Sequence, residues 1–274
     1  MLLYMANHHI PEGPRRIVCL TEEPTETFYL LGEQDRVVGI SAYTVRPPEA
    51  RQDKPIVSAF VHGHLEKIKA LKPDLVIGFS DVQAEWAREL IHANLPVLIL
   101  NQRTLQEIFD VIVQLGSLVG QQKKAQSLVG SYIEGLEAQR ARSEKLSLHP
   151  RVYFEEWDEP MISGISWVSE LIEVAGGQDI FLNQAHGRAA RERYVSVEDV
   201  SKADPNLILA SWCGKKLDPK ALRERSGLEN VNAIVENRIH EVPAEIILQP
   251  GPACLTDGLD YIARIIKDTV AEMT

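Results

Sequence analysis

The chain contains one short phrase twice, at equivalent places in its two halves. The first copy, LEKIKALKPDLVI, covers residues 65–77, and the second, VEDVSKADPNLIL, covers residues 197–209. Apolar residues recur three positions apart at the start of each copy, a spacing that gives a short helix one buried stripe. The runs LVI and LIL that end the copies are typical of buried strands. The repeat predicts helix, break and strand, used twice, and hence two similar α/β lobes with a ligand cleft between them.

A proline marks the break in each copy. Lys72 precedes Pro73 in the first copy, and Asp204 precedes Pro205 in the second. The residue before a proline is disfavoured in the α-helical region. We therefore expect both helices to end at these positions.

Short apolar strands alternate with helical stretches on either side of a long strand-free region. This alternation is typical of parallel sheets. From Thr104 to about Leu146 no strand is indicated, and an apolar stripe from Ala125 to Leu136 predicts one long amphipathic helix. A packed helix of that length resists bending, so the predicted fold is two Rossmann-like α/β lobes with parallel sheets, joined by a long rigid α-helix. The predicted parts are an extension over 1–14, a lobe over 15–118, the connecting helix over 119–148 and a lobe over 149–274.

Composition excludes several classes of function. The 274 residues carry a formal charge of −10, which disfavours a nucleic-acid surface. No apolar run reaches the ~18 residues of a membrane span, and the N-terminus does not have the pattern of a signal peptide. The three cysteines are far apart, so they predict neither a disulfide framework nor a zinc site. Cys19 lies in an apolar strand and is interpreted as a small core residue.

The order of these segments resembles a known family along nearly the whole chain from Arg15. The segments are RIVCLTEEPTE, VVGIS, LEKIKALKPDLVIG, AGGQDIF and YVSVEDVSKADPNLIL. They resemble the substrate-binding proteins of ABC transporters for cobalamin, siderophores and haem, and the phrase LKPDLVI is specific to that superfamily. Short phrases such as SWCGK make the cobalamin-binding branch the most similar.

The resemblance implies a function and a setting. It implies a monomeric binding protein, not an enzyme, that captures a corrinoid such as cobalamin in the cleft and delivers it to the permease dimer of an ABC transporter. It implies no cofactor and no nucleic-acid partner, and a periplasmic or cell-surface location. Two alternatives stay open: a siderophore or haem binder of the same fold, and a cytoplasmic ligand carrier or sensor without a transporter, which the missing signal peptide favours.

Glu66 and Glu198 are the predicted transporter-docking residues. Each falls in the first turn of its helix, at the edge where strands end, and Ser196 with Asp199 forms a capping box at the second helix. Acidic residues in a first turn also complement the helix dipole, which is the alternative role for either residue alone. The matched pair suits a two-fold transporter, and the resemblance implies that it meets transporter arginines.

The predicted ligand contacts follow the strands, because open parallel sheets bind ligands at the carboxyl ends of their strands. The repeat makes Phe79-Ser80-Asp81 equivalent to Ser211-Trp212-Cys213. Large flat ligands are held by aromatic faces with a few polar anchors. Trp86 and Trp167 fall inside predicted helices and are assigned to the core. The predicted set is Glu22, Glu23, Tyr43, Phe60, Ser80, Asp81, Trp157, Tyr194 and Trp212, with His62, Asp158 and Arg193 as further candidates.

The sequence contains residues for two other chemistries, metal binding and acid–base catalysis. His62 and His64 could ligate a metal, but no third ligand stands at metal spacing. The pairs Glu22-Glu23 and Glu155-Glu156 stand at strand ends, where general acids and bases lie. Neighbouring residues on a strand point to opposite faces, so we interpret them as solvated loop acids. No G-x-S-x-G, P-loop or G-x-G-x-x-G motif occurs.

Overall fold

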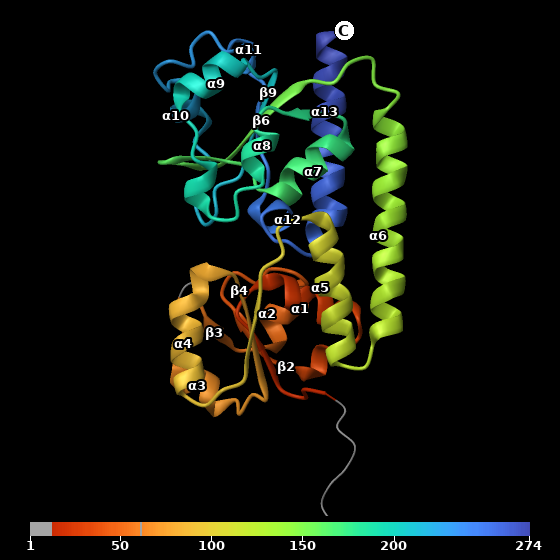
Figure 1. Cartoon of the computed structure of the whole chain (residues 1–274), viewed down its shortest axis with the longest axis vertical. Coiled ribbons are helices and arrows are strands. Elements are labelled where there is room, and N and C mark those ends of the chain that lie inside the picture. The colour runs from red at the N-terminus through yellow and green to blue at the C-terminus, as the bar shows by residue number, and fades with distance from the viewer. Residues whose placement is uncertain (1–12, 61) are drawn as a thin grey trace, which may run out of the picture. The chain divides into compact units, whose positions relative to one another are not determined.

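A computed structural model describes residues 13–60 and 62–274. The chain forms two compact units. Unit 1 contains the residues up to Asn101 together with Val111–Ser127, and unit 2 contains Gln102–Asp110 together with Leu128–Thr274. Helices α5 (Leu105–Leu118) and α6 (Gln122–Ser143) each begin in one unit and continue in the other (Figure 1). The predicted extension over 1–14 lies almost wholly outside the described residues.

The predicted connecting helix is present, but the strand-free region holds two helices rather than one. A turn with Gly120 at a φ of +76° separates α5 from α6. Four residues of the predicted apolar stripe on α6 are buried, namely Ala125, Val129, Tyr132 and Leu136. Ile133 of the same stripe is exposed. The helical period from Ala125 to Leu136 is thus confirmed, and the turn at Gly120 was missed.

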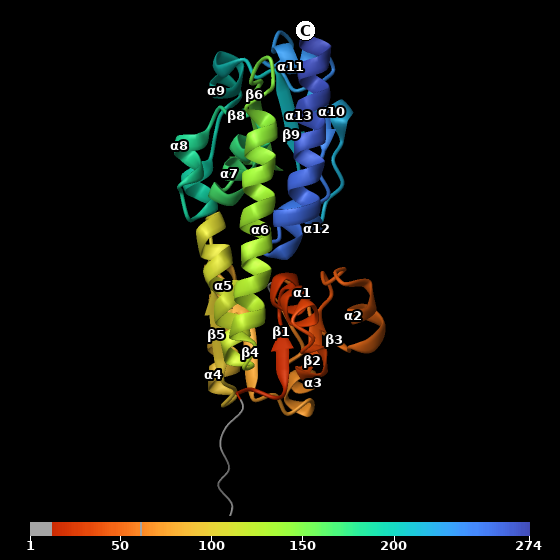
Figure 2. The ribbon, with the colours of Figure 1, turned by 90° about the vertical axis from the view of Figure 1, so that its right-hand side faces the viewer.

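Unit 1 is built on one parallel sheet. Its strands lie in the order β3-β2-β1-β4-β5, with every neighbouring pair parallel. The strands are β1 (Ile17–Cys19), β2 (Val37–Ser41), β3 (Ile56–Ser58), β4 (Leu75–Phe79) and β5 (Val97–Leu100). The helices of this unit are α1 (Glu22–Leu30), α2 (Pro48–Asp53), α3 (Leu65–Ala70) and α4 (Ala84–His92) (Figures 1 and 2). Sequence patterns missed β3, because it has three residues and its first, Ile56, is exposed.

Unit 2 has a mixed sheet of order β10-β9-β6-β7, with the short β8 also paired to β6. Its strands are β6 (Arg151–Asp158), β7 (Met161–Ser163), β8 (Gln178–Asp179), β9 (Leu207–Ala210) and β10 (Ile239–Glu241). Strand β7 alone is antiparallel, because Asp158 pairs with Met161 across a two-residue turn. Its helices are α7 (Ser166–Ala175), α8 (Leu182–Ala185), α9 (Val197–Ala203), α10 (Pro219–Arg223), α11 (Asn232–Val235), α12 (Ala244–Ile247) and α13 (Leu259–Met273). In this unit α6, α7 and α13 lie side by side (Figure 2).

Each unit has its own hydrophobic core. In unit 1, Cys19 packs with Ile17 and Phe28 and is fully buried, which confirms its assignment to the core. Burial raises the pKa of the Cys19 thiol to about 12, so the thiol is protonated at neutral pH. Trp86 and Trp167 are also buried, as predicted.

The repeated phrase has the same structural task in both units. The Asp74 carboxylate accepts the backbone N–H of Arg16 at 2.8 Å, and the Asn206 amide oxygen accepts that of Arg151 at 2.9 Å. In return the backbone N–H groups of Asp74 and Asn206 donate to the carbonyls of Arg16 and Arg151, at 2.9 and 2.8 Å. Each phrase therefore holds the chain just ahead of its own strand, β4 or β9, against the start of the unit's first strand, β1 or β6.

The predicted helix ends are confirmed. Helix α3 ends at Ala70 and α9 at Ala203. Lys72 and Asp204, the residues before the two prolines, adopt φ values of +48° and +42°. Both therefore leave the helix in the left-handed region, which costs a side-chain-bearing residue about 1 kcal/mol or more.

Candidate functional site

The strand order of unit 1 places the first group of candidate residues. Sequence order reverses between β1 and β4, and open α/β sheets bind ligands outside the carboxyl ends of the strands at such a switch point. Glu22 and Glu23 follow β1, while Ser80 and Asp81 follow β4. The topology therefore brings these four predicted residues to the same edge of one sheet.

Glu22 and Glu23 are not solvated loop acids. Both lie in the first turn of α1 and are buried, at 5% and 3% exposure. Burial raises the pKa of Glu23 to about 7, although the Thr21 hydroxyl donates to this carboxylate at 3.0 Å. The interpretation as loop acids was wrong because the helix begins directly after β1 and folds this turn into the unit.

Ser80 has a strained backbone at the end of β4. Its φ of +57° and ψ of −178° lie in a region that is essentially restricted to glycine. The neighbouring Gln83, 1% exposed, accepts the backbone N–H of Phe79 at 2.8 Å and donates to the carbonyl of Phe60 at 2.5 Å. Gln83 thus links the end of β4 to the segment after β3. In this way it positions Ser80 and Phe60, two of the predicted ligand contacts. No sequence signal identified this glutamine.

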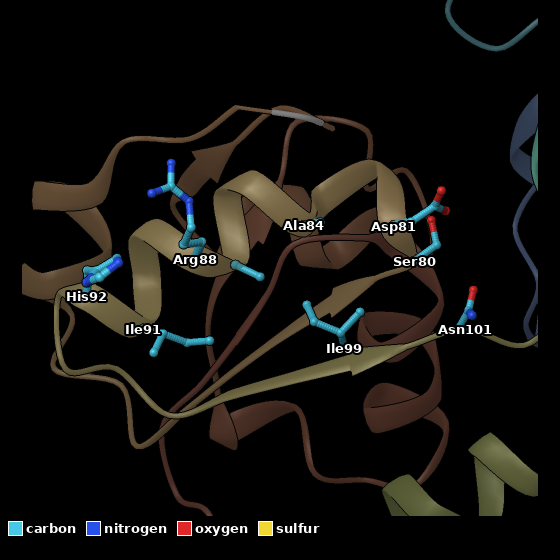
Figure 3. A pocket seen from close by; sticks show the side chains of 9 residues that line it. Ser80, Asp81, Ala84, Arg88, Ile91, His92, Ile99 and Asn101 are labelled. Carbon is cyan, nitrogen blue, oxygen red and sulfur yellow. The ribbon is translucent and has the colours of Figure 1, made fainter.

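A pocket of about 540 Å³ begins at Ser80 and follows the groove beside α4 and β5, within the ~300–1,000 Å³ range of small-molecule sites. Figure 3 shows Ser80, Asp81 and Asn101 at one end of this pocket and Arg88 and His92 at the other. Two isoleucines, Ile91 and Ile99, form the apolar middle and are 60% and 36% exposed. Of the predicted contacts, Ser80 and Asp81 line this pocket.

The other predicted residues of unit 1 lie after β2 and β3. Tyr43, 41% exposed, follows β2, and its ring meets that of Phe60 edge to face with centroids 6.4 Å apart. His62 and His64 are exposed. Over the described residues, no group of three or more His, Cys, Asp or Glu side chains is arranged to hold a metal ion.

Unit 2 places two tryptophans at its own switch point, between β6 and β9. Glu155 of β6 lies opposite Ala210 of β9 in a parallel pair. Trp157 lies near the end of β6 and Trp212 two residues beyond the end of β9, and Trp157 packs against the hydrophobic cluster that contains Trp212. The Trp157 indole N–H donates to the carbonyl of Glu159 at 3.0 Å. Trp212 is 4% exposed, and its buried indole nitrogen makes no hydrogen bond within the described part of the chain.

Lys215 covers both tryptophans, and sequence analysis missed it. Its ammonium lies 4.6 Å from the ring centroid of Trp212 and 5.6 Å from that of Trp157. The same group forms an ion pair with Asp158 at 2.5 Å. Only the turn after β9 brings this lysine back over the rings, so no periodic pattern marks it.

Two ion pairs fix the surroundings of the tryptophans. The Arg225 guanidinium donates to the fully buried Glu155 at 2.5 and 3.0 Å. Arg193 donates to Glu156 at 2.6 and 2.9 Å and is 3% exposed. Arg193 is therefore turned inward and Glu155 is no solvated acid, which corrects both expectations, whereas the next residue, Tyr194, is 51% exposed.

The predicted docking residues lie where the sequence placed them. Glu66 and Glu198 are exposed in the first turns of α3 and α9. Glu66 forms an ion pair with Lys69 at 3.0 Å. The capping box at α9 is confirmed: Asp199 N–H donates to the Ser196 hydroxyl at 3.1 Å, and Ser196 N–H donates to the Asp199 carboxylate at 2.9 Å. The Ser196 hydroxyl also donates to the Asp199 carboxylate at 2.6 Å, and the hydrogen bonds that this carboxylate accepts from the Ser196 hydroxyl and from the Ser196 backbone N–H lower the pKa of Asp199.

Two α/β units with polar and aromatic side chains at their switch points define a small-molecule-binding protein. The chain belongs to the periplasmic binding protein family, whose model matches residues 17–246. It is a substrate-binding protein of the ABC transporter type. No helix among the described residues is long and apolar enough to cross a membrane.

Two proteins are similar to this chain in sequence, and a third is similar in fold. An uncharacterized ABC transporter substrate-binding lipoprotein of Bacillus subtilis is 26% identical over 96% of this chain and 83% of its own length. A vitamin B12-binding protein of Vibrio parahaemolyticus is 28% identical over 92% of this chain and 88% of its own. A periplasmic heme-binding protein of Roseiflexus shares the fold with a TM-score of 0.79 at 23% identity, covering 94% of this chain and 100% of the other.

Proposed function

We propose that this protein captures a corrinoid of the cobalamin type and delivers it to an ABC permease. The observation that carries the proposal is that Trp157 packs against the hydrophobic cluster containing Trp212 and that the Lys215 ammonium lies over both indole rings. Adjacent indole faces suit a large flat macrocycle, since aromatic faces provide much apolar contact area in a defined orientation. The similarity to a vitamin B12-binding protein supports the same ligand class.

The polar candidates of unit 1 are a second group of proposed ligand contacts. Glu22, Glu23, Ser80 and Asp81 gather at the carboxyl edge of the sheet of unit 1, and Tyr43 and Phe60 follow β2 and β3 of the same sheet. A corrinoid carries amide groups around its rim, and these need hydrogen-bond partners when they leave water. Hydroxyl and carboxylate groups at this edge supply such partners. We place Tyr194 among the contacts of unit 2 because it is 51% exposed and bridges Ile162 of β7, the residue that pairs with Trp157 of β6.

Titration with corrinoids tests the ligand. Cyanocobalamin and cobinamide should quench tryptophan fluorescence and release or absorb heat in calorimetry. Trp157→Ala should weaken both responses, whereas the matched control Trp86→Phe, in the core of unit 1, should leave affinity unchanged. If no corrinoid produces heat while haem or a ferric siderophore does, the assignment is wrong and the chain binds another metal chelate.

We propose that Glu66 and Glu198 dock the permease, with one carboxylate from each unit pairing with arginines of the partner. Both side chains are exposed, and they stand at matched positions of the repeat. Removing exposed carboxylates usually changes stability by about 0.5 kcal/mol or less. Charge-assisted bidentate contacts across an interface are stronger than neutral hydrogen bonds. Loss of the pair should therefore affect docking far more than folding.

The double variant Glu66→Ala/Glu198→Ala tests this role with the chain's cognate permease. It should keep its melting temperature and ligand affinity while losing permease binding and ligand uptake. Glu85→Ala/Glu224→Ala, which removes two other exposed carboxylates, is the matched control and should support normal uptake. Uptake unchanged in the Glu66/Glu198 variant would assign both residues to the helix dipole, and reduced ligand affinity would place them in the ligand site instead. Such delivery implies a periplasmic or cell-surface protein, which fractionation of the native host would check.

A further inference from the structure

Lys215 reaches the tryptophans through a tight turn that follows β9. Its backbone N–H donates to the carbonyl of Trp212 at 3.2 Å, and Gly214 between them has a φ of +73°. A positive φ at this position suits glycine, because the left-handed region penalises any Cβ. The turn sends the chain back toward β9, so the Lys215 side chain returns over the ring that precedes it.

The Lys215 ammonium is held by three groups at once. Both indole rings lie within about 6 Å, the range of a cation–π contact, at 4.6 Å for Trp212 and 5.6 Å for Trp157. Asp158, the last residue of β6, supplies the counter-charge at 2.5 Å. Two electron-rich ring faces and one carboxylate form a cage for a cation. The Lys215 ammonium, which lies in this cage, shows that the cage accepts a positively charged group.

This lysine is not locked in place. Its side chain is 49% exposed, and that of Asp158 is 21% exposed. Ion pairs and cation–π contacts at such exposed positions are weak, because water competes for the ammonium and the long side chain loses entropy when it is held. Trp212, by contrast, is 4% exposed and belongs to the core, so the cage stays in place when the lysine moves.

We propose that Trp157, Trp212 and Asp158 form a cation-accepting subsite that Lys215 fills in the absence of ligand. A ligand with a flat cationic face displaces the ammonium and takes its place over the indole rings. The link to corrinoids rests on the proposed function, because a cobalt(III) corrin carries positive charge on its flat core. The cation subsite itself rests on this geometry alone. An experiment can therefore contradict the proposed corrinoid function without contradicting the subsite, and the reverse.

A pair of flat probes tests the subsite without a corrinoid. N-methylacridinium is a permanent cation, whereas acridine at pH 8 is its neutral counterpart of similar size. The cation should bind roughly five-fold more tightly, as followed by quenching of tryptophan fluorescence. Asp158→Asn should reduce this preference, because it removes the negative charge of the cage. Equal affinity for the two probes in the wild-type protein would overturn the subsite.

Lys215→Gln separates a displaceable occupant from a ligand contact. Removing the internal competitor should raise the affinity for N-methylacridinium several-fold. Lys216→Gln makes the same charge change at the exposed neighbouring position and should leave affinity nearly unaltered. A loss of affinity in Lys215→Gln would make the lysine an anchor for the ligand and overturn the proposal, as would equal gains in the two variants, which would reflect net charge alone.

Cobinamide then tests the connection to the proposed ligand. With two water ligands on cobalt the complex is cationic, and with two cyanides it is neutral. The wild-type protein should prefer the diaquo form, and Lys215→Gln should enhance that preference. Preference for the dicyano form would contradict the inference even if corrinoid binding is real. If neither form binds while N-methylacridinium does, the proposed corrinoid function fails and the cation subsite stands.

Discussion

The two switch points of this protein have the same topological origin but carry different chemistry. In unit 1 the reversal between β1 and β4 gathers buried carboxylates and a strained serine. In unit 2 the reversal between β6 and β9 gathers two indole rings under a lysine. Ser80 and Trp212 occupy equivalent places in the repeat, yet one is a small polar residue and the other a core aromatic. Strand order therefore determines where a site lies, and the side chains determine what it binds.

The candidate residues of the two units also differ in how they affect stability. Unit 1 keeps an unfavourable backbone at Ser80 and a buried acid at Glu23. Unit 2 makes Trp212 part of its hydrophobic core, together with Tyr153 and Ile208. The first arrangement costs stability and the second contributes to it. Mutations at equivalent places should therefore act with opposite signs.

The largest expected effect is at Trp212. Trp212→Ala should lower the free energy of unfolding of unit 2 by about 3–5 kcal/mol, because it removes a buried aromatic ring from the core. Urea unfolding followed by circular dichroism measures the change. Trp157→Ala should cost about 1 kcal/mol, since that ring is only half-buried. Equal losses in the two variants would mean that Trp212 does not support the core.

The ionisation of Glu23 should change the stability of unit 1 by a similar amount. The pKa of Glu23 is raised from 4.5 to about 7 in the folded protein, so the folded state binds more protons than the unfolded state between these values. Stability should therefore fall as pH rises through this window, by about 3 kcal/mol in total for this group.

Glu23→Gln removes that titration. Compared with the wild-type protein, the variant should lose less stability between pH 4.5 and 7, and the difference should level off above pH 8. Glu85→Gln, at an exposed carboxylate, is the control and should follow the wild-type curve. Parallel curves for Glu23→Gln and the wild type would show that Glu23 ionises without cost.

Relief of strain at Ser80 should have a smaller and opposite effect. Ser80→Gly should raise stability by about 1 kcal/mol, because the strain removed, ~1–3 kcal/mol, exceeds the entropy cost of glycine, ~0.5–1 kcal/mol. Ser211→Gly is the matched control in unit 2, because Ser211 is not among the residues with a positive φ in residues 13–60 and 62–274, and it should destabilise. If Ser80 contacts ligand, the stabilised variant should bind it less tightly. A destabilised Ser80→Gly would contradict the strain argument.

The smallest expected change in stability concerns the N-cap residues of the two repeated helices. Ser196 caps α9 with its side chain, whereas His64 at the equivalent place makes no side-chain cap on α3. Ser196→Ala should cost about 1 kcal/mol, and His64→Ser should gain a few tenths to 1 kcal/mol. Thermal unfolding of both variants measures whether Ser196→Ala lowers the melting temperature and His64→Ser raises it. A loss of stability in His64→Ser would show that the histidine has another role at this helix start.

Sequence analysis predicted the framework of both units because that framework depends on local signals. The repeated phrase, with its apolar spacing and its proline, indicated the positions of α3 with β4 and of α9 with β9. Capping chemistry at Ser196 and Asp199 marked the start of α9. Since the carboxyl ends of parallel strands share an edge, the same signals placed Ser80 and Trp212 at the carboxyl ends of their strands, and the strand order of the folded chain made these ends switch points.

Tertiary structure alone decided the environment of the candidate residues. Arg193 turned inward to Glu156, Gln83 reached the carbonyl of Phe60, and Lys215 folded back over Trp157. Each of these contacts joins residues from different segments of the chain, so neither periodicity nor spacing in the sequence encodes it. Burial has the same origin: the low exposure and raised pKa of Glu23 come from the elements packed around it, and desolvation is a property of that packing, not of the residue.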